Sequence, residues 1–247
     1  MDREIVNRSL CFHQKRTDET DTPHYAVPCD NYIKVLFSNW PTRHLMQCIA
    51  NKYFRPQIEK FIETATLVSA INFPRLTSAM ADCCGILAIN RVPKIYVSDR
   101  LRGINAICIS VHEEPAIVIS SQACCLSDGE MRFLLGHELS HSCEDSSCHL
   151  VSCWISSTTR RQHPLIGNMI HELLFVHINE WCQSSEYTAD RAGLICCKDI
   201  AYAHQLMKRI GYKEEQHKAI VDYGELYVTH PTIRHRMEQL KQYIVDN

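Results

Sequence analysis

The sequence predicts an α+β domain that is mostly α-helical and carries one small β-sheet. Helical spacing dominates the chain after residue 41, whereas the short runs rich in Ile and Val that suit buried strands gather in residues 94–120. The segment His137-Glu138-Leu139-Ser140-His141 follows these strands and has a spacing that acquires chemical meaning on a helix. A chain of 247 residues is large enough to bury a core without dividing into two domains.

The expected elements follow from helical spacing and from the positions of proline. Residues 1–40 show no clear period and are expected to form an extension, which leaves 41–247 as the domain. The segment 143–163 is rich in Ser, Thr and Cys and is expected to be a loop. The remaining elements are two helices over Thr42–Ala70 broken near Pro56, a helix at 76–87, the strands at 94–120, a helix from near Leu165 past Asp190, and helices at about 199–210, 213–226 and 231–245, the last with Pro231 in its first turn.

The pair His137 and His141 is the strongest indication of chemistry. Residues four apart lie on one helix face, so the two imidazoles can hold one Zn²⁺ while Glu138 reaches a water on that metal. Ser127 and Glu130 form a capping box at the expected start of this helix, and the apolar residues that follow give it a packing face. The pattern predicts a buried helix that carries a hydrolytic metal site.

Such a site needs a third protein ligand and an open position for water. Glu186 and Asp190 are again four residues apart, so a second helix lying against the first could offer Glu186 to the metal. Asp190 could then accept a hydrogen bond from a ligand histidine and fix its tautomer. The alternative layout HExxHxxGxxH is excluded because positions 144 and 147 are Glu144 and Ser147.

Several motifs occur in a fixed order along the chain, and together they resemble a known family. They are Pro93-Lys94-Ile95-Tyr96-Val97, Ile104-Asn105-Ala106-Ile107, Ala116-Ile117-Val118-Ile119, the His137 segment, Glu186-Tyr187-Thr188-Ala189-Asp190-Arg191, and Thr229-His230-Pro231-Thr232 followed by Arg236. From about Tyr53 to Gln242 the chain is similar to the HtpX and CAAX prenyl endopeptidase family of zinc metallopeptidases. Two departures are Ile107, where the family usually has Phe, and Thr232, where it has a second Pro.

The resemblance implies a zincin-like fold, with the small sheet beside the metal helix, and one Zn²⁺ per chain. It also implies peptide-bond hydrolysis, with His137, His141 and Glu186 as ligands and Glu138 as general base. The family places a histidine at His230 to face the developing oxyanion, and Arg236 would orient it or the nearby carboxylates. An extended peptide substrate is expected to add to the strand edge at Asn105, Ala106 and Ile107.

Composition narrows the expected partners and location. The net charge is −2, which gives no electrostatic reason to expect nucleic acid. No stretch reaches the roughly 18 apolar residues of a membrane helix, and the charged first residues lack the core of a signal peptide. We therefore expect a soluble, cytoplasmic endopeptidase acting on peptides or unfolded proteins, with its fourteen cysteines reduced.

Two alternatives to an active endopeptidase remain at this level. A catalytically silent peptide-binding protein could keep the fold, although the retained Glu138 argues against it because an inactive relative could lose that base and still bind metal. A latent enzyme could be covered by residues 1–40 or 143–163. A further possibility is a second structural metal at Cys143, Cys148 and Cys153 with His149, which is less favoured because the spacing is not CxxC.

Overall fold

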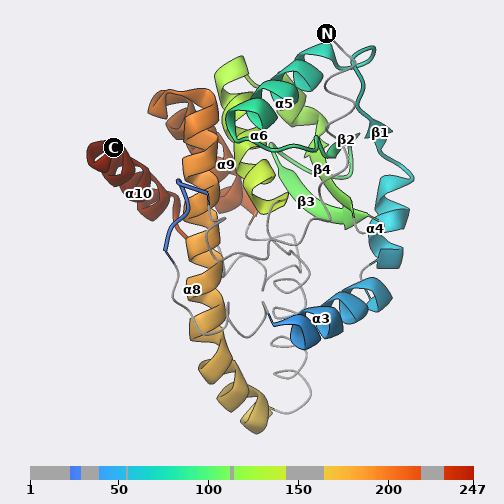
Figure 1. Cartoon of the computed structure of the whole chain (residues 1–247), viewed down its shortest axis with the longest axis vertical. Coiled ribbons are helices and arrows are strands. Elements are labelled where there is room, and N and C mark those ends of the chain that lie inside the picture. Colours follow the sequence, from blue (N-terminus) through green and yellow to red (C-terminus); the bar gives the residue numbers. More distant parts are fainter. Residues whose placement is uncertain (1–22, 29–38, 54, 112–113, 143–163, 218–230) are drawn as a thin grey trace.

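The computed structural model describes residues 23–28, 39–53, 55–111, 114–142, 164–217 and 231–247. Figure 1 shows helices surrounding one small sheet, which confirms the expected α+β class with helices in the majority. The elements are α3 (Trp40–Tyr53), α4 (Arg55–Ile62), β1 (Thr66–Leu67), α5 (Pro74–Ile86), β2 (Lys94–Ser98), β3 (Ala106–Val111), β4 (Glu114–Ser120), the 3₁₀ helix η1 (Ser121–Cys125), α6 (Asp128–Ser142), α8 (Pro164–Cys197), α9 (Ile200–His217) and α10 (Ile233–Asp246).

The sheet is mixed, with strand order β1-β2-β4-β3. β2 and β4 run parallel, with Ile95 opposite Ile117 and Val97 opposite Ile119, and the two outer pairs are antiparallel. The central strand β4 carries Ile117, Val118 and Ile119, which are fully buried. β3 is the last strand in this order, so it forms one edge of the sheet, and it contacts α6.

The two faces of the sheet are covered by different helices. Ile117 and Ile119 face the main core, where they join Met80 of α5 and Leu135 of α6. Val118 points to the other face and belongs to a smaller cluster that includes α4 side chains. This alternation follows from the period of two along a strand, and it fixes α6 directly against the sheet.

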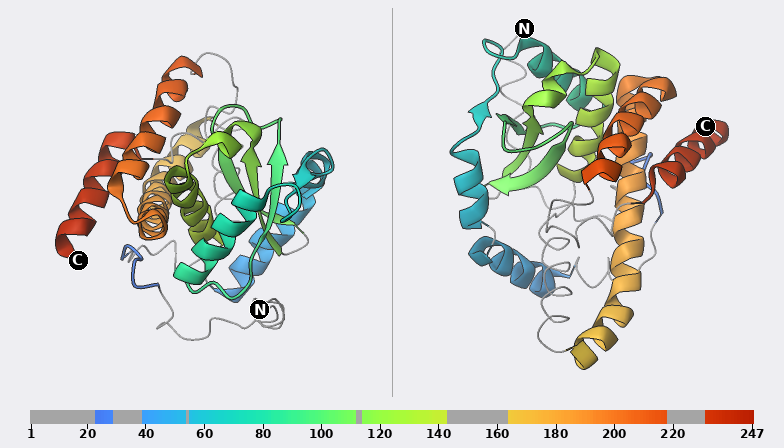
Figure 2. Two further views of the ribbon diagram at one scale, coloured as in Figure 1. Left: turned by 90° about the horizontal axis from the view of Figure 1, so that it is seen from above. Right: turned by 180° about the vertical axis from the view of Figure 1, so that it is seen from behind.

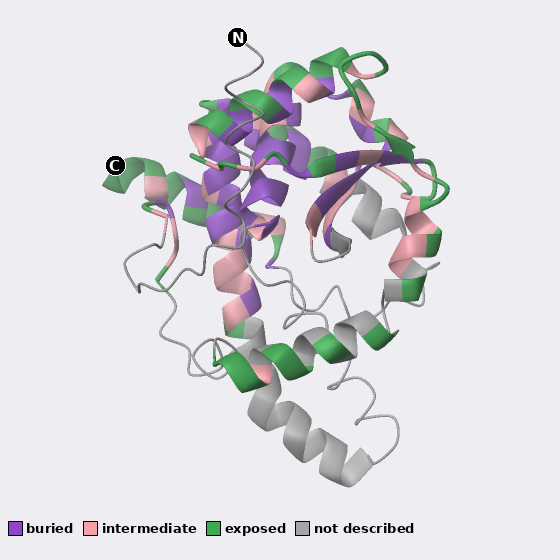
Figure 3. Cartoon of the chain, turned by 45° about the vertical axis from the view of Figure 1, so that its right-hand side comes forward, coloured by how far each residue is buried: buried purple, intermediate pink, exposed green. Residues whose placement is uncertain are grey.

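Helices α8, α9 and α10 lie together on one side of α6. Figure 2 shows α8 against α6; α9 contacts both α6 and α8, and α10 contacts α8 and α9. Figure 3 shows that burial concentrates where α6, the C-terminal half of α8 and the sheet meet. The metal helix expected from the sequence therefore lies at the centre of the molecule, between the sheet and α8.

Several local expectations were wrong, each for a physical reason. The second expected helix ends at Ile62, and residues expected to be helical as far as Ala70 instead include strand β1, since Thr64, Thr66 and Val68 are β-branched and favour extended backbone. Helix α10 starts after Pro231, because Thr232 is its N-cap and its hydroxyl accepts a hydrogen bond from the His235 N–H at 3.4 Å.

Other expectations differ in extent. α9 runs without a break from Ile200 to His217, across the gap expected between 210 and 213, because a single glycine is tolerated within a helix. The cysteines that the structure describes are free thiols; Cys83, Cys84, Cys196 and Cys197 are buried, whereas Cys125 is exposed. The expected loop 143–163, with its cysteines, lies outside the described residues.

A short part of the expected N-terminal extension contacts α8. The Val27 N–H donates to Thr188 Oγ1 at 3.0 Å, and Arg191 donates to the Tyr25 carbonyl at 3.4 Å. Tyr25 itself is buried. Among the described residues, none of the helices has the length and apolar character needed to cross a membrane.

Candidate metal centre

The helix α6 is fixed at its first turn by the capping box that the sequence predicts. The Ser127 N–H and hydroxyl both donate to Glu130 Oε2, at 3.0 and 2.7 Å, and the Glu130 N–H donates to Ser127 Oγ at 3.4 Å. Arg209 of α9 donates to the second Glu130 oxygen at 2.9 Å. Nearly every residue of α6 from Glu130 to Ser142 is buried, so the position of the helix is set on all sides.

Two glycines allow α6 and α8 to approach at backbone distance. A Cβ placed on Gly136 would lie 2.8 Å from Cys196 Sγ and 2.9 Å from the Ala192 carbonyl oxygen. A Cβ on Gly193 of α8 would lie 2.7 Å from the Phe133 carbonyl oxygen. Only glycine fits at such a contact, and the resulting closeness lets short side chains of the two helices meet.

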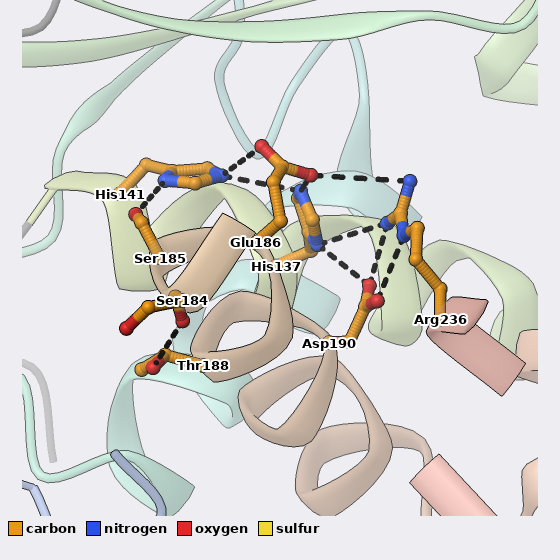
Figure 4. Close-up of polar contacts among 8 residues, drawn as sticks. All are labelled: His137, His141, Ser184, Ser185, Glu186, Thr188, Asp190 and Arg236. Atoms are coloured by element: carbon orange, nitrogen blue, oxygen red, sulfur yellow. Dashed lines mark hydrogen bonds and ion pairs between the residues drawn. The ribbon is translucent and has the colours of Figure 1, made fainter. Parts of the chain in front are cut away.

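The structure brings His137, His141 and Glu186 together (Figure 4). The two Nε2 atoms of the histidines are 3.2 Å apart. His137 Nε2 lies 3.6 Å from Glu186 Oε2, and His141 Nε2 lies 3.4 Å from Glu186 Oε1. The ligand-type atoms of all three residues lie within 4.8 Å of one another.

These distances fit a small tetrahedral cation. Ligand bonds of roughly 2.0–2.1 Å with tetrahedral angles place neighbouring donor atoms about 3.3 Å apart. The separation of the two imidazole nitrogens and the distance from each of them to its nearer Glu186 oxygen lie on either side of that value, and two imidazoles with one carboxylate are donors that Zn²⁺ accepts. The residues present therefore fit the metal that the sequence pattern predicts.

Asp190 lies one helical turn after Glu186 and faces the back of His137. His137 Nδ1 and Asp190 Oδ1 are 3.1 Å apart, and Arg236 of α10 donates to both Asp190 oxygens at 2.5 and 2.8 Å. Burial by itself raises the pKa of Asp190, but the Arg236 guanidinium and the contact with His137 hold that pKa below its usual value. An ionised carboxylate thus stands behind one of the two imidazoles.

Arg236 contacts the carboxylates of α8. In addition to its contacts with Asp190, Arg236 has its Nη1 atom 3.9 Å from Glu186 Oε2. The nearby acidic residue Glu238 of the same helix pairs with Arg234 at 2.9 Å. Arg236 therefore connects α10 to the candidate site. It contacts the carboxylates and is not itself a candidate ligand.

Two further residues adjoin the candidate ligands in the sequence. Glu138 follows His137 on α6 and is buried, with 6% of its surface exposed. Ser185, which the sequence analysis did not single out, lies with its Oγ 3.4 Å from His141 Nδ1. A serine directly before a candidate ligand is too common to be noticed without coordinates.

The expected substrate residues occupy a separate position at the sheet edge. Ala106 and Ile107 begin β3, and Asn105 stands just before it, with its N–H donating to Ser120 Oγ at 3.1 Å. All three are partly exposed. His230, the expected oxyanion donor, lies outside the described residues.

A helix bearing HExxH, packed against a second helix that supplies a glutamate, defines the class of zincin-like metallopeptidases. Comparison with known proteins gives the family: the model of peptidase family M48 matches residues 70–244, and the chain belongs to this family. This confirms the resemblance drawn from the motifs.

A curated relative agrees with the family assignment. The chain is 29% identical over 139 residues to the Plastoglobule-localized metallopeptidase 48, chloroplastic, of Arabidopsis thaliana. The match covers 56% of this chain and 40% of that relative, so the chain spans well under half of the relative's length. No solved structure matches the chain.

Proposed function

We propose that this protein is a zinc-dependent endopeptidase that hydrolyses peptide bonds in peptides or unfolded proteins. The observation that carries the proposal is the convergence of His137 Nε2, His141 Nε2 and the Glu186 carboxylate from two helices. Three protein donors leave a fourth tetrahedral position for water or substrate, as hydrolysis requires. One Zn²⁺ bound there would polarise a scissile carbonyl and lower the pKa of water toward ~7.

Glu138 acts as the general base in this proposal. It stands next to His137 on the same helix and is buried. The carboxylate takes a proton from the attacking water and later delivers it to the leaving amine, so one group serves both halves of the reaction. Asp190 fixes the ring of His137, Arg236 holds Asp190, and His230 is proposed to face the developing oxyanion.

The substrate is proposed to bind along β3. Among the described strands, β3 pairs only with β4, and it lies at the sheet edge beside α6. An extended peptide can add to such an edge through main-chain hydrogen bonds, which accept many sequences. Asn105, Ala106 and Ile107 stand at the start of this edge.

The biological setting is also proposed and not assigned by the family. Turnover of damaged proteins and maturation of a peptide precursor both need an endopeptidase with this kind of site. A cytoplasmic location and the division into an extension at 1–40 and a domain at 41–247 stay predictions. The relative's name places that protein in a chloroplast, which lends the cytoplasmic prediction no support.

The test is cleavage of an unfolded protein by the wild type, with and without a chelator, beside Glu138→Gln. We expect cleavage by the wild type, loss on chelation and recovery with zinc. Glu138→Gln should bind zinc but cleave about 10²–10⁴-fold more slowly, since it removes the general base. Glu63→Gln, an exposed residue after α4, is the matched control and should cleave normally.

Cleavage by Glu138→Gln at the wild-type rate would contradict the proposed mechanism. A wild type that binds zinc yet cleaves nothing, even after trimming of the N-terminal residues, would favour the silent peptide-binding alternative.

A further inference from the structure

His141 and Ser185 form a contact that neither the family assignment nor the ligand pattern accounts for. Ser185 Oγ lies 3.4 Å from His141 Nδ1, the ring nitrogen that faces away from Glu186 (Figure 4). This distance lies beyond the usual N–H···O range of about 2.7–3.2 Å, so the contact is a weak one.

The contact repeats the arrangement around His137. There, Nε2 faces Glu186 while Nδ1 faces Asp190 at 3.1 Å. In His141, Nε2 likewise faces Glu186 at 3.4 Å while Nδ1 faces Ser185. Each imidazole thus has one nitrogen in the cluster and one against a polar side chain of α8.

The tautomer follows from this geometry. A metal ion held by the cluster would take the lone pair of Nε2, which would leave the ring proton on Nδ1. The Nδ1–H of His141 then donates to the Ser185 hydroxyl oxygen, as the Nδ1–H of His137 donates to the Asp190 carboxylate. In both cases the acceptor selects the tautomer that can bind metal and restricts rotation of the ring.

We infer that Ser185 is a positioning residue for His141, so that α8 supplies one ligand, Glu186, and an orienting group for each histidine. The inference rests on the proposed metal centre. The two orienting groups are unequal: Asp190 is an ionised carboxylate braced by Arg236, whereas Ser185 is a neutral hydroxyl. The His141 side chain is also more exposed than that of His137, at 23% against 10%.

The difference between Asp190 and Ser185 as orienting groups determines how much zinc affinity Ser185→Ala is expected to lose. Loss of a group that orients a metal ligand typically weakens metal affinity 10–100-fold. A neutral hydroxyl at 3.4 Å should lie at the lower end, so Ser185→Ala is expected to weaken zinc binding about tenfold. Ser185→Thr keeps the hydroxyl and should stay within about threefold of the wild type.

The matched control is Ser184→Ala, one residue earlier on the same helix. In Figure 4 Ser184 lies beside Thr188, away from the imidazoles, and its carbonyl accepts a hydrogen bond from the Thr188 hydroxyl at 2.8 Å. The full chain and each variant are titrated with zinc against a competing chelator. The visible absorption of Co²⁺-loaded protein reports the coordination geometry, and thermal unfolding of the metal-free forms reports their stability.

The inference is supported if Ser185→Ala loses affinity and alters the Co²⁺ spectrum, while Ser184→Ala and Ser185→Thr match the wild type. It is overturned if Ser185→Ala stays within twofold of the wild type, or if Ser185→Thr is as weak as Ser185→Ala. A matching drop in metal-free stability of Ser185→Ala also overturns it, because the role is then structural. A wild type without zinc affinity removes the metal centre itself, whereas a normal wild type with a normal Ser185→Ala removes this inference alone.

Discussion

Asp190 shows how one buried carboxylate can be kept charged beside the candidate metal centre. Its side chain is 1% exposed, and Arg236 binds both of its oxygens. The His137 ring completes the environment of the carboxylate at 3.1 Å. Since burial alone would favour the neutral acid, the ionised form depends on Arg236, and the orientation of His137 depends in turn on the ionised form.

Asp190→Asn is therefore expected to have two effects. It leaves Arg236 partly buried without its anion, which should lower the free energy of unfolding by about 3 kcal/mol, and it should weaken zinc affinity about 10–100-fold. Denaturant unfolding and a zinc titration measure the two effects separately. The control is Asp128→Asn, whose partner Arg75 and own side chain are 64% and 78% exposed, and which should cost less than about 1 kcal/mol. Equal losses in the two variants would contradict this role of Asp190.

The sequence predicted part of this residue-scale picture. His137, His141, Glu186 and Asp190 could be found because each pair keeps helical spacing, which converts directly into a shared face. The family resemblance offered Arg236 as a partner of His230 or the nearby carboxylates, but its pairing with Asp190 in particular, and the contact of Ser185 with His141, depend on how α6, α8 and α10 lie against one another. Helix arrangement leaves no local pattern in the chain, so these contacts required coordinates.

At the scale of elements, the site depends on the close contact between α6 and α8. Gly136, next to His137, permits this contact because its α-carbon faces Cys196 and the Ala192 carbonyl. A methyl group there would meet backbone as well as side chain, so one helix must move. Any displacement of α6 from α8 separates the histidines from Glu186.

Gly136→Ala should lower the free energy of unfolding by about 1–3 kcal/mol through overpacking, although alanine favours helix more than glycine. Zinc affinity should fall with it. Gly85→Ala in α5 is the control, because nothing lies within 4 Å of its added methyl group and it should be neutral or slightly stabilising. The same denaturant experiment compares both, and an unchanged Gly136→Ala would show that the helices do not rely on this approach.

The capping box of α6 makes a separate prediction about pH. Burial raises the pKa of Glu130, but hydrogen bonds from Ser127 and the Arg209 guanidinium outweigh it and hold the pKa below its usual value. A carboxyl whose pKa is lower when folded stabilises fully above its unfolded pKa of about 4.3, and this stabilisation is lost as pH falls through the folded value. Glu130→Gln should cost about 1 kcal/mol near neutral pH.

The measurement for Glu130 is the free energy of unfolding at several pH values. The difference between wild type and Glu130→Gln should shrink below about pH 4, because the wild-type carboxyl then becomes protonated. Glu63→Gln, which removes one exposed carboxylate elsewhere on the chain, is measured beside it as the control for the loss of one negative charge. A difference that stays constant from neutral to acid pH would rule out the ionised capping box as its source.

Elements were predictable where a strong local pattern exists. The capping box located the start of α6 to the residue, and the Ile and Val runs located β2 and β4. β1 was missed since two residues cannot show an alternating pattern, and its strand character comes from pairing with β2. Pairing with a strand that is distant in the sequence cannot be predicted from the pattern of neighbouring residues.

At the scale of the whole molecule, α6, the helix that carries His137 and His141, is packed between the sheet and the C-terminal helices. The sequence predicted the class and the order of motifs, but not the strand order β1-β2-β4-β3 or the packing of α9 against both α6 and α8. The family match begins at residue 70, whereas residues 25 and 27 contact α8 near the candidate ligand Glu186. The scaffold around the site thus draws on segments far apart in the chain.

The most direct test of the central claim is a crystal structure of the zinc-loaded protein with anomalous scattering recorded at the zinc edge. The account predicts one strong peak about 2.0–2.2 Å from His137 Nε2, His141 Nε2 and a Glu186 oxygen, with a fourth position open to solvent. A peak bound elsewhere, or a Glu186 carboxylate turned away from the ion, would contradict it.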